Sequence, residues 1–315
     1  MPLSYLPFKV QVLAVRRLSP SFVRITLGGV ELGDMDDGGS LGTRDTRIKV
    51  VIPASQGRPD HDIDVSDPDW YRTWLALDPS TRGHVRTYTA RSARLSAAVP
   101  EIDIDLVMHL DEHGAGGPAT VWAANAQLGQ RLTVIAPNRH HGKATGIEWR
   151  PPTLATGRPL RVLIAGDETA APAIAAILES LPDPHIGHAL IEVPTAADVQ
   201  VLLAPPDMTV TFLVRGNRPR GELLQAALEN AVPSLAPTAC RAPDVPAVDI
   251  DTQILWETPQ DEPGTSAGAA EPFYAWIAGE AAVVRDIRRT LVRDHGISRE
   301  RVAFMGYWRQ GRAEG

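Results

Sequence analysis

The stretch Arg86-Thr-Tyr-Thr-Ala-Arg91 holds the side chains best suited to bind a flat, phosphate-bearing molecule. The pattern indicates a short strand, in which Arg86, Tyr88 and Ala90 share one face because side chains alternate. An arginine offers a planar fork of donors to a phosphate, a tyrosine offers a ring for stacking, and a threonine offers a hydroxyl near the backbone. This combination suits a flavin nucleotide, although the same six residues would also be ordinary in a plain surface strand.

A second candidate site is the glycine turn Gly116-Gly-Pro-Ala-Thr120, which leads into a short apolar helix predicted over residues 119–126. The first turn of a helix has free backbone N–H groups and a partial positive charge, so it can hold a phosphate. Thr120 could add a hydroxyl. An ordinary loop followed by a helix cap explains the same residues equally well.

A third candidate site is the turn Gly166-Asp-Glu-Thr-Ala-Ala-Pro172, which follows a continuous apolar run. In doubly wound sheets, ligands bind at the carboxyl ends of the strands, near the point where the strand order reverses. The turn lacks the G-x-G-x-x-G fingerprint of dinucleotide-binding domains. Taken alone, its Asp-Glu-Thr start would first be interpreted as a helix cap.

The sequence predicts no metal site held by protein side chains. His140 and His141 are adjacent, so they would not share a helix face, and no cysteine or carboxylate pattern accompanies them. The G-x-S-x-G motif of serine hydrolases is also absent from the sequence.

Composition bounds the class of protein. The 315 residues are 43% hydrophobic and 22% charged, which predicts a globular protein of two domains. The formal net charge of −7 argues against a nucleic-acid binder, although a local basic pocket remains compatible with it. Cys240 is the single cysteine, which fits a reducing cytoplasm. No stretch approaches ~20 apolar residues, so we expect neither a membrane span nor a signal peptide.

The first half of the chain predicts an antiparallel β-barrel in a domain of residues 1–148. Apolar and polar residues alternate at residues 8–12, 23–27 and 102–106. Further strands are expected at residues 46–52 and 131–136, and many strands with little helix are typical of a small barrel.

The second half predicts a doubly wound α/β domain with a parallel sheet over residues 160–315. A linker is expected at residues 149–159, which contain three prolines and a glycine and show no periodicity. Continuous apolar strands then alternate with helices, which is typical of parallel sheets covered on both faces. Residues 233–272, rich in proline, alanine and acidic residues, predict a long loop or insertion.

Taken in order, these blocks resemble the siderophore-interacting protein family, which consists of FAD-dependent ferric-siderophore reductases with a ferredoxin-reductase-like architecture. The resemblance runs from about residue 8 to residue 312. Its most specific blocks are Ala165-Gly-Asp-Glu-Thr169 and Gly306-Tyr-Trp-Arg309, and Gly117-Pro-Ala-Thr-Val-Trp-Ala123 also fits. Ala171 and Gln130 depart from residues that are more common in the family.

The resemblance implies cofactor roles for residues of all three candidate sites. Tyr88 would stack on the isoalloxazine of FAD, Thr89 would bond to its reactive edge, and Arg86 would hold the phosphates. The remaining predicted cofactor-binding residues are Arg91, Asp105, Val107 and His109, then Gly117, Ala119 and Thr120, and finally Gly166, Asp167, Glu168 and Thr169. The last four would border the nicotinamide of NADPH or NADH as the electron donor.

Which nicotinamide would serve is left open by the residues. Arg215 and Arg218 follow a predicted strand and could meet the 2′-phosphate of NADPH, whereas Glu192 after the preceding strand favours NADH.

The implied substrate is a ferric siderophore, and no acid–base catalyst is expected. Two basic residues, Lys49 and Arg309, are candidates for binding an anionic chelate in a basic cleft between the domains. A solvated strand residue and a C-terminal surface charge are the simpler interpretations of these two. Two other functions stay open: an iron-shuttling protein with a vestigial flavin, and a ferredoxin-type flavoprotein with another electron acceptor.

Overall fold

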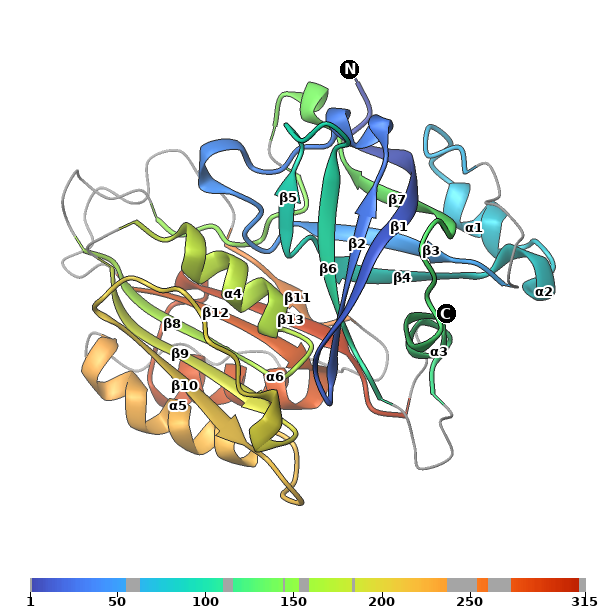
Figure 1. Ribbon diagram of the computed structural model, residues 1–315. Coiled ribbons are helices and arrows are strands. Elements are labelled where there is room, and N and C mark those ends of the chain that lie inside the picture. Colours follow the sequence, from blue (N-terminus) through green and yellow to red (C-terminus); the bar gives the residue numbers. More distant parts are fainter. Residues whose placement is uncertain are drawn as a thin grey trace. The chain divides into compact units, whose positions relative to one another are not determined.

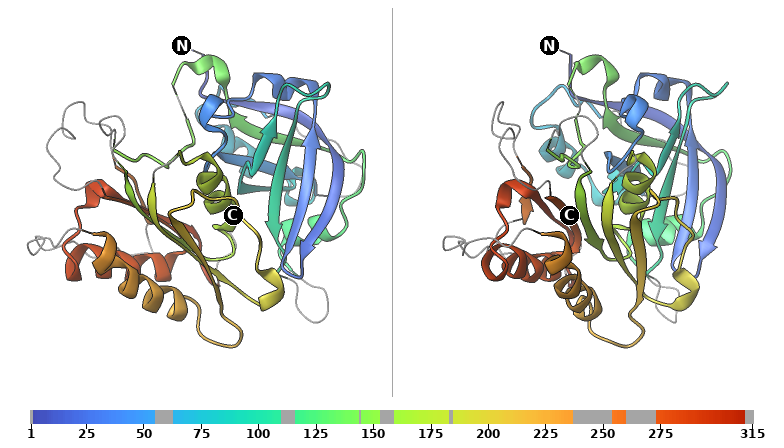
Figure 2. Two further views of the ribbon diagram at one scale, coloured as in Figure 1. Left: turned by 60° about the vertical axis from the view of Figure 1, so that its left-hand side comes forward. Right: turned by 90° about the vertical axis from the view of Figure 1, so that its left-hand side faces the viewer.

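The computed structural model describes residues 2–54, 63–109, 116–143, 145–152, 159–182, 185–236, 254–259 and 273–311. The chain divides into two compact units, Met1–Ile147 and Glu148–Arg312, here called unit 1 and unit 2. Each unit is built on its own sheet (Figures 1 and 2).

Unit 1 is a seven-stranded sheet in the order β4-β3-β7-β1-β2-β6-β5, and its pairs are all antiparallel. Just after β4, the Arg91 N–H donates to the Asp103 carbonyl of β6 at 2.8 Å, so the sheet curls towards a barrel. The strands are β1 (Tyr5–Ser19), β2 (Phe22–Gly28), β3 (Arg47–Ile52), β4 (His84–Thr89), β5 (Ser92–Arg94), β6 (Glu101–Val107) and β7 (Arg131–Pro137).

Alternation along these strands separates two apolar clusters on opposite faces of the sheet. Ile48 and Val50 point into the main core, whereas Val51 and Val85 pack in a smaller cluster with Trp74. Trp74 belongs to the short helix α1 (Trp70–Leu75), which is followed by α2 (Pro79–Arg82). The one other α-helix among the described residues of unit 1 is α3 (Pro118–Ala124), whose buried side chains join the main core.

Unit 2 is a six-stranded sheet in the order β10-β9-β8-β12-β13-β11. Its pairs are parallel except for β11, which runs antiparallel to β13. The strands are β8 (Arg161–Gly166), β9 (Ile186–Val193), β10 (Met208–Val214), β11 (Trp256–Glu257), β12 (Phe273–Glu280) and β13 (Val302–Trp308). The chain leaves β8 in one direction for β9 and later returns beside it as β12, so the strand order reverses between β8 and β12.

Helices cover both faces of this sheet. The core on one face joins side chains of α5 (Glu222–Leu235) and α6 (Ala281–Arg288) to those of β8 and β12. Helix α4 (Ala171–Ser180) lies on the other face (Figure 1). The predicted fold class, an antiparallel β-barrel followed by a doubly wound α/β domain, is confirmed.

The predicted loop at residues 233–272 differs from the structure at two places. Helix α5 extends to Leu235, into this loop, because Ala231, Val232 and Leu235 are buried, and this burial outweighs the helix-weakening Pro233. The same loop contains β11, and its residues 237–253 and 260–272 lie outside the described ones. Elsewhere in unit 2, helix α6 is followed directly by a π-helix at Arg289–Asp294.

The predicted linker begins inside unit 2. The rings of Trp149 and Tyr274 meet edge to face at 5.1 Å between centroids, and the Arg150 N–H donates to the Tyr274 hydroxyl at 3.1 Å. Residues 153–158 of that linker lie outside the described residues. In the part of the chain that the structure describes, no helix has the length and apolar character needed to cross a membrane.

Candidate functional site

Unit 1 brings ten of the predicted cofactor-binding residues onto three neighbouring elements. Strand β4 carries Arg86, Tyr88 and Thr89, and Arg91 follows it; β6 carries Asp105 and Val107, and His109 follows it; α3 is capped by Gly117 and carries Ala119 and Thr120. Helix α3 contacts both β4 and β6. Elements that are separated by ten or more residues in the sequence therefore lie next to one another in unit 1.

Strand β4 presents an aromatic ring and a cation on one face. Tyr88 is half-buried and packs against the main core, and the neighbouring Ala90 is completely buried there. Arg86 shares that face of the strand. Its guanidinium donates to the Val85 carbonyl at 2.9 Å, and no carboxylate among the described residues pairs with it. Its remaining donors are therefore available for an anion.

Strand β6 contributes its backbone edge. Ile102, Ile104 and Leu106 point into the core, so Asp105 lies on the outer face, where it accepts two bonds from Arg24 at 2.6 and 2.8 Å. The side chain of Asp105 is therefore occupied by an ion pair within the protein.

Although the Asp105 side chain is paired, the backbone of β6 near Asp105 has one edge without a neighbouring strand among the described residues. The Met108 N–H donates across to the Ser21 carbonyl next to β2, and backbone groups alternate in direction along a strand. Those of Asp105 and Val107 therefore face away from β2. Strand β5 pairs with β6 only over residues 101–103, so no described strand covers this edge.

Trp122 of α3 is a residue that the sequence reasoning missed. It is buried, and its indole N–H has no hydrogen-bond partner among the described residues. A buried unpaired donor is uncommon because it loses a hydrogen bond to water without replacement. Its place in an apolar helix made it look like ordinary core.

In unit 2, six charged side chains and one tryptophan gather at the carboxyl ends of the parallel strands. We call this set the carboxyl-edge cluster; it comprises Asp167, Glu168, Glu192, Arg215, Arg220, Glu280 and Trp308. Each residue lies at the end of a strand or in the turn that follows it. The cluster therefore surrounds the point where the strand order reverses, which is where ligands bind in sheets of this kind.

Glu168 and Arg215 form the centre of the cluster. Glu168 is completely buried and accepts two bonds from Arg215, at 3.0 and 3.2 Å, and one from Arg220 at 2.5 Å. Arg215 also donates to Glu192 at 3.0 Å. Burial opposes ionisation of Glu168, but the bonds from the two arginines lower the pKa of its carboxyl below the usual value.

Asp167 ties the turn to two other strands. Its carboxylate accepts from the N–H and hydroxyl of Thr169, from the Glu280 N–H at 2.9 Å and from the Trp308 indole at 2.9 Å. Burial, reinforced by the nearby Glu168, raises the pKa of this carboxyl despite these donors.

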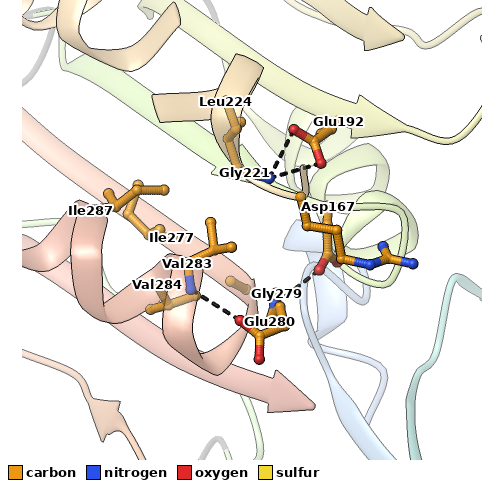
Figure 3. A pocket seen from close by; sticks show the side chains of 12 residues that line it. Asp167, Glu192, Gly221, Leu224, Ile277, Gly279, Glu280, Val283, Val284 and Ile287 are labelled. Carbon is orange, nitrogen blue, oxygen red and sulfur yellow. Dashed lines mark hydrogen bonds between the residues drawn. The ribbon is translucent and has the colours of Figure 1, made fainter. Parts of the chain in front are cut away.

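The space beside the cluster is small. A cavity of about 10 Å³ lies between the starts of α5 and α6. Figure 3 shows Asp167, Glu192 and Glu280 around it. A cavity of this size holds about one water molecule. A Cβ on Gly166 would lie 2.5 Å from the Ala170 Cβ and 2.6 Å from the Ala278 carbonyl oxygen, so this glycine permits close packing of the turn.

In the structure, Arg215 and Glu192 are not placed to choose between NADH and NADPH, as the sequence had suggested. Arg215 has 7% of its side chain exposed and Glu192 has 1%, and the two are bonded to each other. Neither can select the 2′ position of a ribose, since each already serves the other. Arg218 is 60% exposed and pairs with Glu222 on the surface.

Comparison with known proteins covers both units. Residues 11–141 match the siderophore-interacting FAD-binding domain, and residues 160–311 match the model described as siderophore-interacting protein. The uncharacterized protein Rv2895c of Mycobacterium tuberculosis (strain ATCC 25618 / H37Rv) is 32% identical over 309 residues, which are 96% of this chain and 90% of that protein. The chain belongs to the siderophore-interacting protein family.

Two further relatives agree with this family. The ferric vibriobactin reductase ViuB of Vibrio cholerae is 27% identical over 299 residues, covering 94% of this chain and 87% of that protein. The siderophore-interacting protein SipS from Aeromonas hydrophila has a solved structure that is 26% identical with a TM-score of 0.65, covering 99% of this chain and 94% of that one. A ferredoxin reductase in carbazole 1,9a-dioxygenase, at 13% identity and a TM-score of 0.53, shows the likeness of the fold alone.

The residues of unit 1 fit the FAD that its domain is described as binding. FAD is flat at one end and carries two phosphates, so it needs a ring to stack on and donors for its oxygens. Arg86 without a carboxylate, the half-buried Tyr88, the open edge of β6 and the unpaired Trp122 indole supply such groups.

The two candidate substrate residues of this siderophore-interacting protein lie in different units. Lys49 of β3 lines a cavity of about 230 Å³ in unit 1, together with Leu3, Ser4, Tyr5, Arg47, Val65, Trp70 and Ile135. Arg309 follows β13 in unit 2, next to Trp308. Among the described residues, no group of three or more histidine, cysteine or acidic side chains could hold a metal ion.

Arg215→Leu tests whether the carboxyl-edge cluster stabilises unit 2. Removing Arg215 leaves Glu192 buried without its cation and Glu168 with Arg220 alone, so we expect a loss of about 3–5 kcal/mol in the free energy of unfolding. Arg218→Leu, which breaks an exposed pair, should cost under about 1 kcal/mol. Chemical denaturation of both variants measures this; similar small losses would contradict a central role for Arg215.

Proposed function

We propose that this protein is an FAD-dependent reductase that takes electrons from NADH or NADPH and reduces ferric iron held in a siderophore. The observation that carries the proposal is the meeting of Arg86, Tyr88 and Thr89 with the open edge of β6 and with α3 in unit 1. The name of the relative ViuB, a ferric vibriobactin reductase, supports the same reaction class.

The chemistry of the proposed substrate explains why reduction would release iron. Ferric iron is a hard cation that oxygen ligands hold tightly, and the ferrous ion binds the same ligands less strongly. A nicotinamide donor gives up two electrons as a hydride, whereas each ferric ion takes one, so one donor would serve two ferric siderophores. Bound FAD would accept the electrons in pairs and release them singly.

The protein's own side chains would then bind and orient rather than transfer protons. In this proposal, Arg86 holds the phosphates of FAD, Tyr88 fixes the plane of its ring system, and Thr89 bonds to its reactive edge. Thr89 is largely buried, with 9% of the residue exposed. Asp105, Val107, His109, Gly117, Ala119 and Thr120 would line the pyrophosphate and adenosine end.

In unit 2, the turn Gly166–Thr169 would receive the nicotinamide donor at the carboxyl ends of β8 and β12. The side chains of Asp167 and Glu168 are bonded within the protein, so we assign them the role of holding this turn in place. We further propose that the reaction takes place in the cytoplasm, since a single cysteine suits a reducing compartment.

Arg86→Gln tests the flavin assignment. A charge-assisted contact to phosphate contributes about 1.5–3 kcal/mol, so FAD should bind roughly tenfold to a hundredfold more weakly. The matched control is Arg72→Gln, which removes an exposed arginine of α1 in the same unit. Flavin fluorescence during titration of the two apoproteins measures both affinities; equal affinities would contradict the role of Arg86.

Charge reversal at Lys49 and Arg309 tests the substrate assignment. An anionic chelate is attracted by local positive charge, so Lys49→Glu and Arg309→Glu should each slow ferric-siderophore reduction by roughly tenfold at low salt, and less at high salt. Reduction of the flavin by the nicotinamide should not change, because neither residue contacts the donor in this proposal. The quantity to compare is the ratio of the two rates.

The control for this comparison is Lys143→Glu, which makes the same change in net charge within unit 1. If the ratio falls equally in Lys143→Glu, the effect is one of overall charge, and neither Lys49 nor Arg309 binds the substrate. If the flavin is reduced but no ferric chelate releases ferrous iron, the electron acceptor is another molecule, such as a partner protein.

A further inference from the structure

Arg220 differs from the other charged members of the carboxyl-edge cluster. Its side chain is 27% exposed, whereas those of Arg215, Glu168 and Glu192 are 7% exposed or less. Among the described residues it donates one hydrogen bond, of 2.5 Å, to Glu168, and its guanidinium lies 4.9 Å from the centroid of the Trp308 ring. Most of the N–H donors of this guanidinium are therefore left for another partner.

Glu168 would remain paired without Arg220. Arg215 meets both oxygens of Glu168 with two different nitrogens, which is the strongest geometry for an arginine and a carboxylate. If Arg220 turned away, Glu168 would keep these two bonds. The indole face of Trp308 would still hold the guanidinium near the turn.

The position of Arg220 indicates what its partner would be. It lines the small cavity together with Asp167, Gly221 and Glu280, at the carboxyl ends of β8 and β12. The buried carboxylates of this edge would repel an anion, and Arg215 is enclosed between two of them. Arg220 is thus the exposed cation of the cluster that could meet a phosphate there.

We propose that Arg220 binds the pyrophosphate of the nicotinamide donor by exchanging its contact with Glu168 for a contact with phosphate. This inference rests on the proposed function, in which the donor enters at Gly166–Thr169. It adds a donor-binding residue that carries a positive charge, which the turn itself lacks. Arginine suits this exchange because its planar fork fits phosphate as well as it fits carboxylate.

A purely structural role is the competing explanation. Arg220 could serve only to neutralise Glu168, in which case its loss would reduce stability without changing the affinity for the donor. The two explanations differ in salt dependence. A direct contact with phosphate adds an ionic interaction that salt screens, so its removal should flatten the dependence of donor affinity on salt.

The test is calorimetric binding of ADP-ribose to the FAD-loaded protein. ADP-ribose carries the pyrophosphate but neither the nicotinamide nor a 2′-phosphate, so no turnover occurs. Arg220→Gln should bind it roughly tenfold more weakly, at the low end for a charged contact because the Glu168 bond is given up in exchange. Arg220→Lys, which keeps the charge but loses the fork, should fall between Arg220→Gln and the parent. Arg293→Gln removes a surface arginine paired with Asp294 and should match the parent.

Equal affinity and an equal salt dependence in Arg220→Gln and the parent would overturn the proposal. If Arg220→Gln does not fold, Arg220→Lys decides, and unchanged binding in that variant overturns it as well. Failure of the proposed function would look different. If the parent binds no ADP-ribose and its flavin is reduced by neither NADH nor NADPH, both the proposed function and the role of Arg220 are wrong. If the parent's flavin is reduced normally but Arg220→Gln binds ADP-ribose as the parent does, only the role of Arg220 is wrong.

Discussion

The buried bridge from Glu168 through Arg215 to Glu192 is the interaction on which the second unit depends. It joins the ends of β8, β9 and β10, and Asp167 extends it to β12 and β13 through Glu280 and Trp308. A buried charge is tolerated only when it is paired, so these side chains hold the strand ends in one arrangement. The turn at the reversal of strand order is thereby held in place before any ligand arrives.

Among its described residues, unit 1 differs from unit 2 in leaving hydrogen-bond donors unpaired, where they are available to a cofactor. Its main core is apolar and continuous, and Asp105 is neutralised by Arg24 on the outer face. What stays open is the backbone edge of β6, the guanidinium of Arg86 and the Trp122 indole. In the proposed function the two units divide the roles: unit 1 leaves groups available for the flavin, and the charged residues of unit 2 hold the turn at which the donor would bind.

Sequence patterns predicted the fold well and the roles of charged residues less well. The alternation of Ile102, Ile104 and Leu106 indicated β6, because one face of that strand is apolar. The continuous apolar run before Gly166 indicated β8, because a strand covered on both faces is apolar along its length.

Glu168 looked like part of a helix cap, and Glu192 and Arg215 looked like opposing determinants of donor choice. Their pairing joins residues 23 and 47 positions apart, and no local pattern reveals it. The signal that could have identified them is shared position, since each lies at the end of a predicted strand or just after it.

The most direct test of the proposed function is the absorbance spectrum of the purified protein during anaerobic titration, first with NADH or NADPH and then with a ferric siderophore. The account predicts a flavin spectrum that the donor bleaches and that the ferric siderophore restores, with ferrous iron captured by a chelator; a flavin that neither nicotinamide reduces would contradict it.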